Sequence, residues 1–343
     1  MAESPIELEG AGGRGRIIRS ALTLSLVTGK GFVIEKIFPE QDHFGVHSQN
    51  LAVVQAAADI SSAEVEGNDL NSTRLSFLPG KVLPGEYTFN VGTAGSTVLL
   101  LQTLCLPLAL AGTPSVLTLH GGTHVPFSPP CSYLEDAWLP GLHEFGIGVE
   151  LQLMKPGFFP RGGGILRARI RGDGLAGTLN PGALGELEGA TVRSITGNLP
   201  FHVGERQLNR IIQNLKDAFV AAVGGTETLI SEAPGTVVQV IGHFTSGRRV
   251  VYAEIGKKGQ SAEEMADLVC DNFLEFLDSP GNVDEYAADQ MMIPLALSPE
   301  AGEYVGPKMT DSMRSASAVI EAFLPGRIVL EDLVDGGVRV RKT

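Results

Sequence analysis

The sequence predicts an α/β fold made of repeated strand–helix units, with a smaller α/β domain inserted late in the chain. Three observations support this. Apolar patterns of strand and helix type alternate over residues 5–171, glycine-rich loops stand at several strand–helix junctions, and the order strand, helix, strand, helix, strands occurs twice. A chain of 343 residues is also long enough for two or three domains and a large core.

The first unit opens with a strand, a glycine loop and a helix over residues 5–29. Four glycines precede the helix: Gly10, Gly12, Gly13 and Gly15. Such a loop offers backbone N–H groups to an anion, and its spacing satisfies the G-x-G-x-x-G pattern of dinucleotide-binding proteins. Two interpretations stay open from the pattern alone: a nucleotide site, which Arg14 and Arg16 favour slightly, or a tight turn in an α/β protein.

The two repeated units together are expected to span residues 5–171. The first continues with a strand at 31–37, a helix at 48–62 and short strands at 64–66 and 72–77. The second has a strand at 87–91, a helix at 97–111, a strand at 115–119, a helix at 133–145 and strands at 148–155 and 165–171.

A glycine-rich stretch without periodicity, residues 172–189, predicts a boundary before the inserted domain. The insert is expected to contain a strand at 190–198, a helix at 205–223, strands at 236–243 and 249–254, and a helix at 261–277. A capping box, Ser261 to Glu264, marks the start of that last helix. Residues 278–283 then return the chain to the first architecture, with helices at 284–297 and 316–324 and closing strands at 327–331 and 337–341.

Composition narrows the classes of function and location. The net charge of −13 and pI near 5.0 argue against a broadly basic surface that coats nucleic acid, but they permit a local basic pocket. The three cysteines are isolated and lack metal-site spacing, and no signal-peptide pattern is visible. The longest apolar run, residues 98–111, is short and contains Pro107. We therefore expect a cytoplasmic protein that does not enter a membrane.

Three local motifs each allow a structural and a functional interpretation. Gln102 follows a second glycine-containing loop at 92–96. This loop either only caps the helix, or it borders a pocket in which the Gln102 amide hydrogen-bonds to the edge of an adenine. Tyr286 shares a helix face with Asp289 or Gln290, at a solvated helix start or in a pocket. His124, in a Gly-Gly-Thr-His loop, is the best-placed histidine, although no histidine pair has metal-site spacing. The sequence contains neither a G-x-S-x-G nor a P-loop motif.

Taken in order, the motifs resemble the RNA 3′-terminal phosphate cyclases over nearly the full chain. The segments that carry the resemblance include LEGAGGRGRIIRSALTLS, VGTAGSTVLLLQTLCLPL, LTLHGGTHVPFSPP, GFFPRGGG and EYAADQMMIPLAL. The resemblance implies three ββαβα-type repeats similar to the C-terminal fold of translation initiation factor 3, with a small α/β domain inserted before the third. We expect repeats one and two at 1–180, the insert at 181–277 and the third repeat at 278–343. This fits the motifs better than a Rossmann dehydrogenase does.

The resemblance also implies a reaction and its participants. In the family a histidine attacks the α-phosphorus of ATP with Mg²⁺ or Mn²⁺ present, and AMP passes to an RNA 3′-phosphate. The vicinal 2′-hydroxyl then displaces AMP to form a 2′,3′-cyclic phosphate. Carried over by motif, the ATP site comprises Gln102, Tyr286, Ala287, Ala288, Asp289 and Gln290. Phosphate or the RNA 3′ end is expected to meet Arg14, Arg19, Gln49 and His124.

Three departures from the family pattern keep a second function open. Ser312 occupies the position of the nucleophilic histidine, and the sequence has no histidine after His243. The first glycine loop is shorter and has Arg14 in place of a metal-binding glutamate. The loop at 41–48 has no arginine. The chain is therefore expected to be an ATP-dependent cyclase, or a catalytically inactive relative that binds RNA ends or a protein partner.

Overall fold

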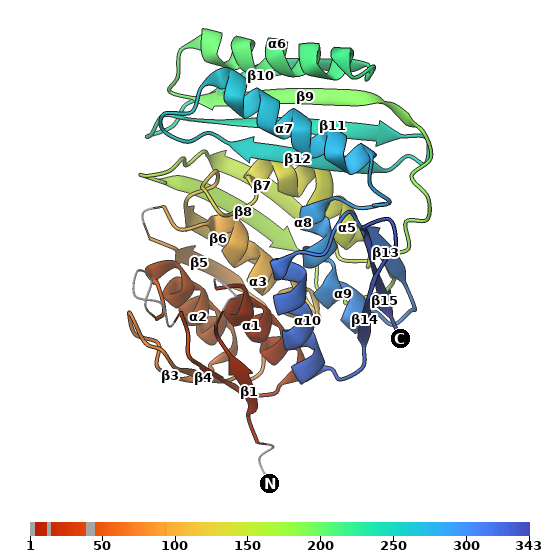
Figure 1. Ribbon diagram of the computed structural model, residues 1–343. Helices are drawn as coiled ribbons and strands as arrows, with labels where there is room; N and C mark the ends of the chain where they lie inside the picture. The colour runs from red at the N-terminus through yellow and green to blue at the C-terminus, as the bar shows by residue number, and fades with distance from the viewer. Residues whose placement is uncertain (1–3, 12–14, 39–44, 93) are drawn as a thin grey trace.

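The computed structural model describes residues 4–11, 15–38, 45–92 and 94–343 (Figure 1). Its first unit contains two helices and a four-stranded sheet. The elements are β1 (Ile6–Glu9), α1 (Arg16–Thr28), β2 (Phe32–Glu35), α2 (Ser48–Ser61), β3 (Glu64–Glu66) and β4 (Leu75–Leu78). The strand order is β1-β2-β4-β3, with β1 and β2 parallel and the other neighbours antiparallel.

The second unit repeats this topology strand for strand. Its strands are β5 (Glu86–Asn90), β6 (Ser115–Gly121), β7 (Val149–Lys155) and β8 (Gly164–Ile170), in the order β5-β6-β8-β7. Its helices are α3 (Thr97–Ala109), then α4 (Cys131–Tyr133), a π-helical turn (Leu134–Trp138) and α5 (Leu139–Glu144) in succession. The predicted duplication is confirmed. Both units run strand, helix, strand, helix, strand, strand, which differs from the ββαβα order that the resemblance implies.

The third unit follows the inserted domain and has the same sheet without its first strand. It contains α8 (Glu285–Gln290), α9 (Met292–Leu297), β13 (Glu303–Gly306), α10 (Asp311–Phe323), β14 (Ile328–Asp332) and β15 (Val338–Lys342). The order β13-β15-β14 matches the last three strands of the other units. Where their first strand would stand, the Asn282 backbone N–H donates to the Val305 carbonyl oxygen at 2.8 Å. We call the three units together the main body.

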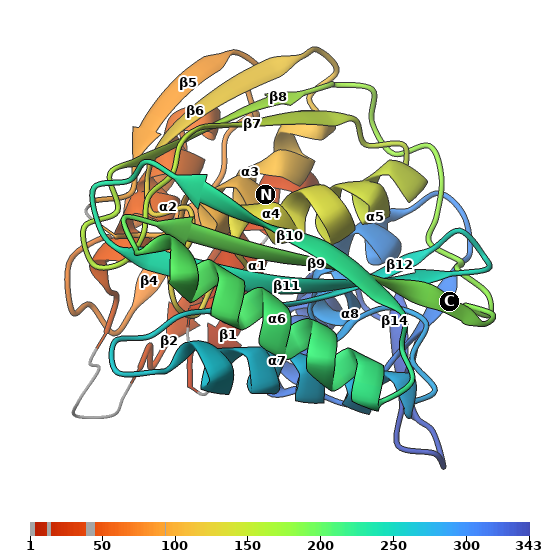
Figure 2. The same ribbon diagram turned by 90° about the horizontal axis from the view of Figure 1, so that it is seen from above.

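The inserted domain is a sheet with two helices on one face (Figure 2). It contains β9 (Leu187–Gly197), α6 (Phe201–Asp217), β10 (Ala222–Leu229), β11 (Gly235–Phe244), β12 (Arg249–Ile255) and α7 (Ala262–Leu277), in the order β10-β9-β11-β12. Val238 and Val240 of β11 pack in the insert's own core, whereas Ile241 packs into the core of the main body. Burial of both faces explains the nearly continuous apolar run of β11.

Several predicted element boundaries are wrong for identifiable reasons. The helix expected at 205–223 ends at Asp217, because Phe219 takes a positive φ of 60° and Val223 enters the unpredicted strand β10. The single helix expected at 284–297 is divided at Met291 into α8 and α9. Pro294 contributes to this break because it has no N–H to donate.

Two further differences concern the second and third units. The helix expected from 316 starts at Asp311, where the Thr310 side chain caps it, and strand β13 was not predicted. The helix expected at 133–145 starts at Cys131 and includes the π-helical turn. A four-residue strand and a change of helical type leave little periodicity in a sequence, because each spans too few residues.

Helices from all three units pack in the centre of the main body. Helix α1 lies against both α3 and α10 (Figure 1). The buried side chains of the three units form one continuous apolar core. The capping box of α7 is formed as predicted, by Ser261 and Glu264. Within the described ranges, no helix combines the length and apolarity needed to cross a membrane.

Candidate functional site

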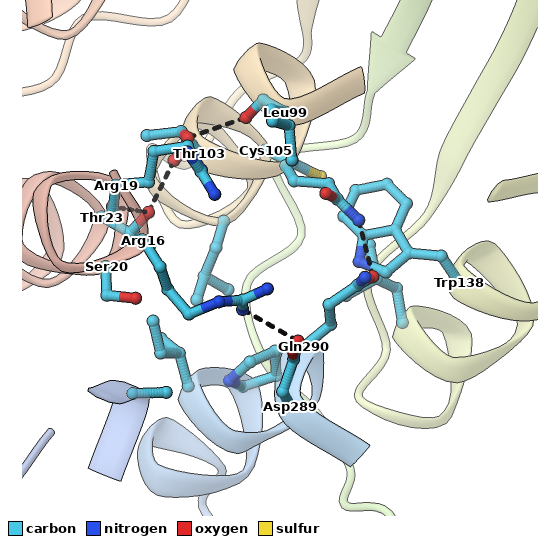
Figure 3. Close-up of a pocket in the computed structure, with 16 residues that line it drawn as sticks. Arg16, Arg19, Ser20, Thr23, Leu99, Thr103, Cys105, Trp138, Asp289 and Gln290 are labelled. Carbon is cyan, nitrogen blue, oxygen red and sulfur yellow. Dashed lines mark hydrogen bonds and ion pairs between the residues drawn. The ribbon is translucent and has the colours of Figure 1, made fainter. Parts of the chain in front are cut away.

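Two adjoining pockets lie where the first turns of α1, α3, α8 and α10 meet beneath the inserted domain. They share five residues: Arg16, Arg19, Leu99, Asp289 and Gln290. The inner pocket continues between α1, α3 and the π-helical turn, and includes Ser20, Thr23, Gln102, Thr103, Cys105 and Trp138 (Figure 3). The outer pocket opens toward the insert, and includes residues 126–130, 253–255, Lys257, Tyr286 and Ser312.

An ion pair between the first and third units stands at the boundary of the two pockets. Arg16, the first residue of α1, donates from Nη1 to Oδ1 of Asp289 in α8 at 2.9 Å (Figure 3). Asp289 is buried, which raises the pKa of its carboxyl, whereas Arg16 and the Ser312 hydroxyl lower that pKa. The turn that leads into Arg16 depends on Gly15, whose φ is 80°. A Cβ on this residue would stand 2.8 Å from the side-chain amide of Asn50, so a residue other than glycine would not fit.

Arg19 adds a second cation one helical turn further along α1. Burial, and then the neighbouring Arg16, lower the pKa of its guanidinium to about 9, while Asp289 raises it. Arg19 therefore stays protonated at neutral pH. In the inner pocket, two guanidinium groups against one carboxylate leave excess positive charge. Guanidinium groups near helix N-termini are well suited to binding phosphate oxygens.

The inner pocket combines an amide pair with apolar walls. The Gln102 Nε2 donates to Oε1 of Gln290 at 2.6 Å, which joins α3 to α8. Trp138, from the π-helical turn, and Leu99 supply nearly buried apolar surface beside this pair. Side-chain amides offer both a donor and an acceptor, and a flat apolar slot with a few polar groups suits a heterocyclic base.

The outer pocket brings the main body and the insert together. Ser312 is the second residue of α10, and Tyr286 is 38% exposed, with its ring edge-on to Tyr133 at 5.5 Å. From the other side, the end of β12 and the loop after it contribute Glu254 and Lys257. The insert thus forms a wall of this pocket.

Comparisons with known proteins agree on one family. The family model described as RNA 3′-terminal phosphate cyclase matches residues 9–330. A protein named RNA 3′-terminal phosphate cyclase from Pseudomonas fluorescens is 39% identical, over 99% of this chain and 98% of its own length. The chain belongs to the RNA 3′-terminal phosphate cyclase family. Proteins of the same name from Ectopseudomonas mendocina and Ralstonia nicotianae are each 38% identical, with at least 95% of each chain covered.

The structure brings most of the residues expected from the cyclase family to the two pockets. Gln102, Asp289 and Gln290 line the inner pocket together with Arg19, and Tyr286 and Ser312 line the outer one. Gln49 lies at the start of α2, where its Oε1 accepts from the backbone N–H of Ser96 at 3.3 Å. Arg14 lies outside the described residues.

Two of the expected ATP-site residues lie elsewhere on α8. Ala287 and Ala288 are buried in the core and line neither of the two pockets. The Ala288 carbonyl oxygen accepts from the Tyr304 hydroxyl at 2.6 Å. Ala288 therefore packs α8 against β13 of the third unit, and Ala287 faces the second unit and the insert. Tyr286, Asp289 and Gln290 contribute to the two pockets instead.

His124 is placed in the interior next to the insert. Its side chain is 1% exposed, its ring stacks on Phe158 at 4.9 Å, and its Nδ1 lies 2.7 Å from the Thr123 Oγ1. Burial, and then Arg193, lower the pKa of His124 to about 4. A neutral, buried imidazole that lines neither pocket is poorly placed to meet a phosphate.

Several pocket residues were not assigned to a site from the sequence, among them Arg16, Trp138 and Lys257. Arg16 stood out as a cation beside the glycine loop, but its pairing with Asp289 crosses 273 positions of sequence. Trp138 is the chain's single tryptophan, and it reaches the inner pocket through the π-helical turn. Lys257 precedes the α7 capping box, and no role was predicted for it. The local sequence indicated Arg16 through its place beside the glycine loop, but nothing in the local sequence indicated Trp138 or Lys257.

The described residues do not fit a metal site built from protein ligands. None of their His, Cys, Asp and Glu side chains form a group of three or more placed to hold an ion. In the pockets Asp289 pairs with Arg16, Glu285 lies 3.3 Å from the Lys308 Nζ, and Glu254 accepts from Asn272. These side chains therefore do not provide a ligand set for Mg²⁺ or Mn²⁺.

Asp284, which orients α8 beneath the site, is expected to give a pH-dependent stability. Its Oδ1 caps α8 and accepts from the Tyr133 hydroxyl at 2.6 Å, yet burial raises its pKa to about 6. A carboxyl whose pKa is higher in the folded state stabilises most below its unfolded pKa near 4, and this stabilisation disappears as the pH rises through about 6.

Asp284→Asn isolates this effect. The free energy of unfolding of the native protein, minus that of Asp284→Asn, should fall between about pH 4 and about pH 7.5. Urea unfolding of both proteins at each pH measures it. A difference that does not change with pH would contradict the assignment.

Proposed function

We propose that this protein converts an RNA 3′-phosphate end to a 2′,3′-cyclic phosphate with ATP as the energy source. The observation that carries the proposal is the convergence of Arg16 and Arg19 with the Gln102–Gln290 pair in one pocket. The amides and Trp138 suit an adenine, and the arginines suit its phosphates. Relatives that match nearly the full length of this chain are named RNA 3′-terminal phosphate cyclase, and these names support the same reaction. Three buried free cysteines support a cytoplasmic location.

The reaction needs two displacements at phosphorus. In the first, an oxygen of the RNA 3′-phosphate attacks the α-phosphorus of ATP and pyrophosphate leaves, which joins AMP to the RNA end. A protein nucleophile that accepted AMP before the RNA would add a third displacement. In the second, the vicinal 2′-hydroxyl attacks the RNA phosphorus and AMP leaves with the bonding electron pair. The roles of Arg16 and Arg19 would be to hold phosphate oxygens and to offset the charge that develops on them. Mg²⁺ or Mn²⁺ would enter as the counter-ion of ATP.

Ser312 decides between two forms of this proposal. A serine hydroxyl is a weak nucleophile at neutral pH unless a base activates it. The carboxyl that lies beside it, Asp289, already binds Arg16. The RNA 3′-phosphate oxygen can instead attack ATP directly, which needs no protein nucleophile. The presence of Ser312 in place of the family histidine also favours a second candidate function. In that case the protein binds RNA ends or a partner protein without turnover.

One assay separates these functions. The protein is incubated with ATP labelled at the α-phosphate, Mg²⁺ or Mn²⁺ and an oligoribonucleotide with a 3′-phosphate. Cyclic product without protein-bound label supports cyclisation by direct attack. Protein-bound AMP shows a protein nucleophile: an acid-stable bond indicates a serine phosphodiester and an acid-labile bond a histidine phosphoramidate. If neither product nor label forms although the oligonucleotide binds, the chain is a binding protein and the enzymatic proposal is wrong.

The variant Ser312→His is expected not to bring turnover to the level of cyclases that carry the family histidine. It supplies an imidazole beside Asp289, but the shortened first loop still has Arg14 in place of the glutamate that the resemblance assigns to metal. Cyclisation rates for the variant and for a histidine-bearing cyclase, measured under the same conditions, check this. Full turnover from the single substitution would show that the loop change is neutral.

A further inference from the structure

The edge strand β10 of the inserted domain is long, exposed and almost uncharged. It pairs with β9 on one side only, and most of its eight residues are exposed to solvent. Four other edge strands, β1, β3, β7 and β14, each carry two charged side chains, which discourage pairing with another chain. The single charge of β10, Glu227, lies 3.5 Å from Arg193 of β9. The edge of β10 therefore lacks this protection.

The backbone of β10 presents a row of hydrogen-bonding groups at this edge. The Ala190 backbone N–H donates to the Ala221 carbonyl oxygen at 2.8 Å. Because alternate residues of a parallel strand bond to one neighbour, the even-numbered residues of 222–228 direct their N–H and C=O groups away from β9. Gly224 and Gly225 carry no side chain, and glycines within a strand often stand where another backbone approaches closely.

Helix α6 continues the exposed surface with an apolar stripe. Arg206 and Arg210 form ion pairs with α7 on one side of the helix. At 100° per residue, Phe201, Leu208 and Ile212 lie on the opposite side, next to β10. Phe201 is 59% exposed, and the other two are only partly buried. The edge of the insert thus offers a strand and an apolar helix face together.

A second copy against this edge would continue both layers of the insert at their existing spacing. Helix α6 packs on both β9 and β10. Strands lie about 4.8 Å apart, so two copies of α6 would lie about 10 Å apart, which is the ordinary distance between packed helices. The strand pairing and the helix packing are therefore compatible with each other.

One two-fold axis serves the strand and the helix. A Cβ on Gly204 of α6 would stand 3.3 Å from the Thr226 Cγ2, so these residues lie at the same level. Helix α6 runs opposite to β10, because it connects two parallel strands. Arg210 is about 9 Å further along the helix and Gly224 about 7 Å back along the strand. An axis through Gly224 therefore passes the middle of the apolar stripe.

We propose that this edge joins two copies of the chain, with β10 antiparallel to β10 of the second copy in one continuous sheet. About the axis, Leu208 meets Ile212 of the second copy. Glu205 likewise meets Lys216 of the second copy, and the symmetry repeats this pair. Both charged residues are exposed, and neither forms an ion pair within the described part of the chain. The face is thus complementary to itself, as a two-fold interface requires.

A charge exchange tests the helix contact, with the dimer dissociation constant measured by sedimentation velocity. Lys216→Glu should weaken the dimer about tenfold, because two attractive pairs become repulsive. The double variant Glu205→Lys/Lys216→Glu should regain the native dissociation constant. The two positions are about 16 Å apart on one helix, so they cannot compensate within a single chain. A double variant as weak as Lys216→Glu would overturn the proposal.

A lysine on the strand tests the edge of the sheet. Val223 is 71% exposed, and Val223→Lys should weaken the dimer about a hundredfold, because two lysines would face each other near the axis. Val334, fully exposed in the turn between β14 and β15, provides the control, and Val334→Lys should associate as the native protein does. The proposal is wrong if the native protein stays monomeric up to about 0.1 mM, or if both lysine variants dimerise equally.

Discussion

Replacement of Arg19 by alanine is expected to weaken ATP binding about a hundredfold, since hydrogen bonds from a charged donor are worth roughly 1.5–3 kcal/mol each and a guanidinium can make two. Arg19 lines both pockets, and its partial burial strengthens its attraction for phosphate. Without Arg19, only Arg16 would offset the negative charge of Asp289, which would then repel the phosphates of ATP more strongly. Isothermal titration with ATP measures the effect.

The control for Arg19 is a surface arginine elsewhere. Arg206 on α6 is half exposed and pairs with Glu263 of α7. Arg206→Ala should bind ATP as tightly as the native protein, because an exposed ion pair contributes little and stands away from the pockets. If Arg19→Ala binds ATP within a factor of about two of the native value, the nucleotide phosphates do not lie where we place them.

The second large effect is expected at Asp136, in the π-helical turn. Its Oδ2 accepts from the Arg193 Nη1 at 3.0 Å and from the Gln239 Nε2 at 2.7 Å, and its Oδ1 lies 3.9 Å from Arg249. These three partners come from β9, β11 and β12, so one carboxylate holds the sheet of the insert against the main body. Asp136→Ala would leave Gln239, which is fully buried, and Arg193 without this acceptor.

We expect Asp136→Ala to lower the free energy of unfolding by about 2 kcal/mol, because the buried Gln239 amide loses its acceptor while Arg193, which is partly exposed, keeps only Glu227 at 3.5 Å. The outer pocket should also lose binding of a 3′-phosphate oligonucleotide, since the insert supplies Glu254 and Lys257 to it. Hydrogen exchange should show faster opening in β11 and β12. Asp59→Ala, at an exposed position on α2, serves as the control. Equal protection in the Asp136 and Asp59 variants would show that the carboxylate does not anchor the insert.

Much of the architecture follows from local pattern. The alternation of strand and helix signals, repeated in two units, predicted the duplicated topology because each amphipathic element must bury one face. The capping box of α7 was readable because its hydrogen bonds join residues three positions apart. Tyr286, Asp289 and Gln290 were grouped by helical spacing alone, and they do face the pockets.

Local pattern was insufficient where burial or distant contact decides the outcome. Strand β10 has two glycines and few apolar residues, and its pairing with β9 establishes it. His124 sits in a loop that could bind phosphate, but its packing on Phe158 removes it from the pockets. Ala287 and Ala288 share the motif of the pocket residues and face the core instead.

By itself, the sequence determined the duplicated α/β architecture, the insert and the family, because these depend on periodicity and on the order of motifs along the chain. The tertiary structure alone decided which side chains share a site. Arg16 meets Asp289 across 273 positions, and Gln102 meets Gln290 across 188. Such pairs form because α1 packs against α3 and α10, and α8 packs against α10, around a common core, and no local pattern specifies how helices from different units will pack.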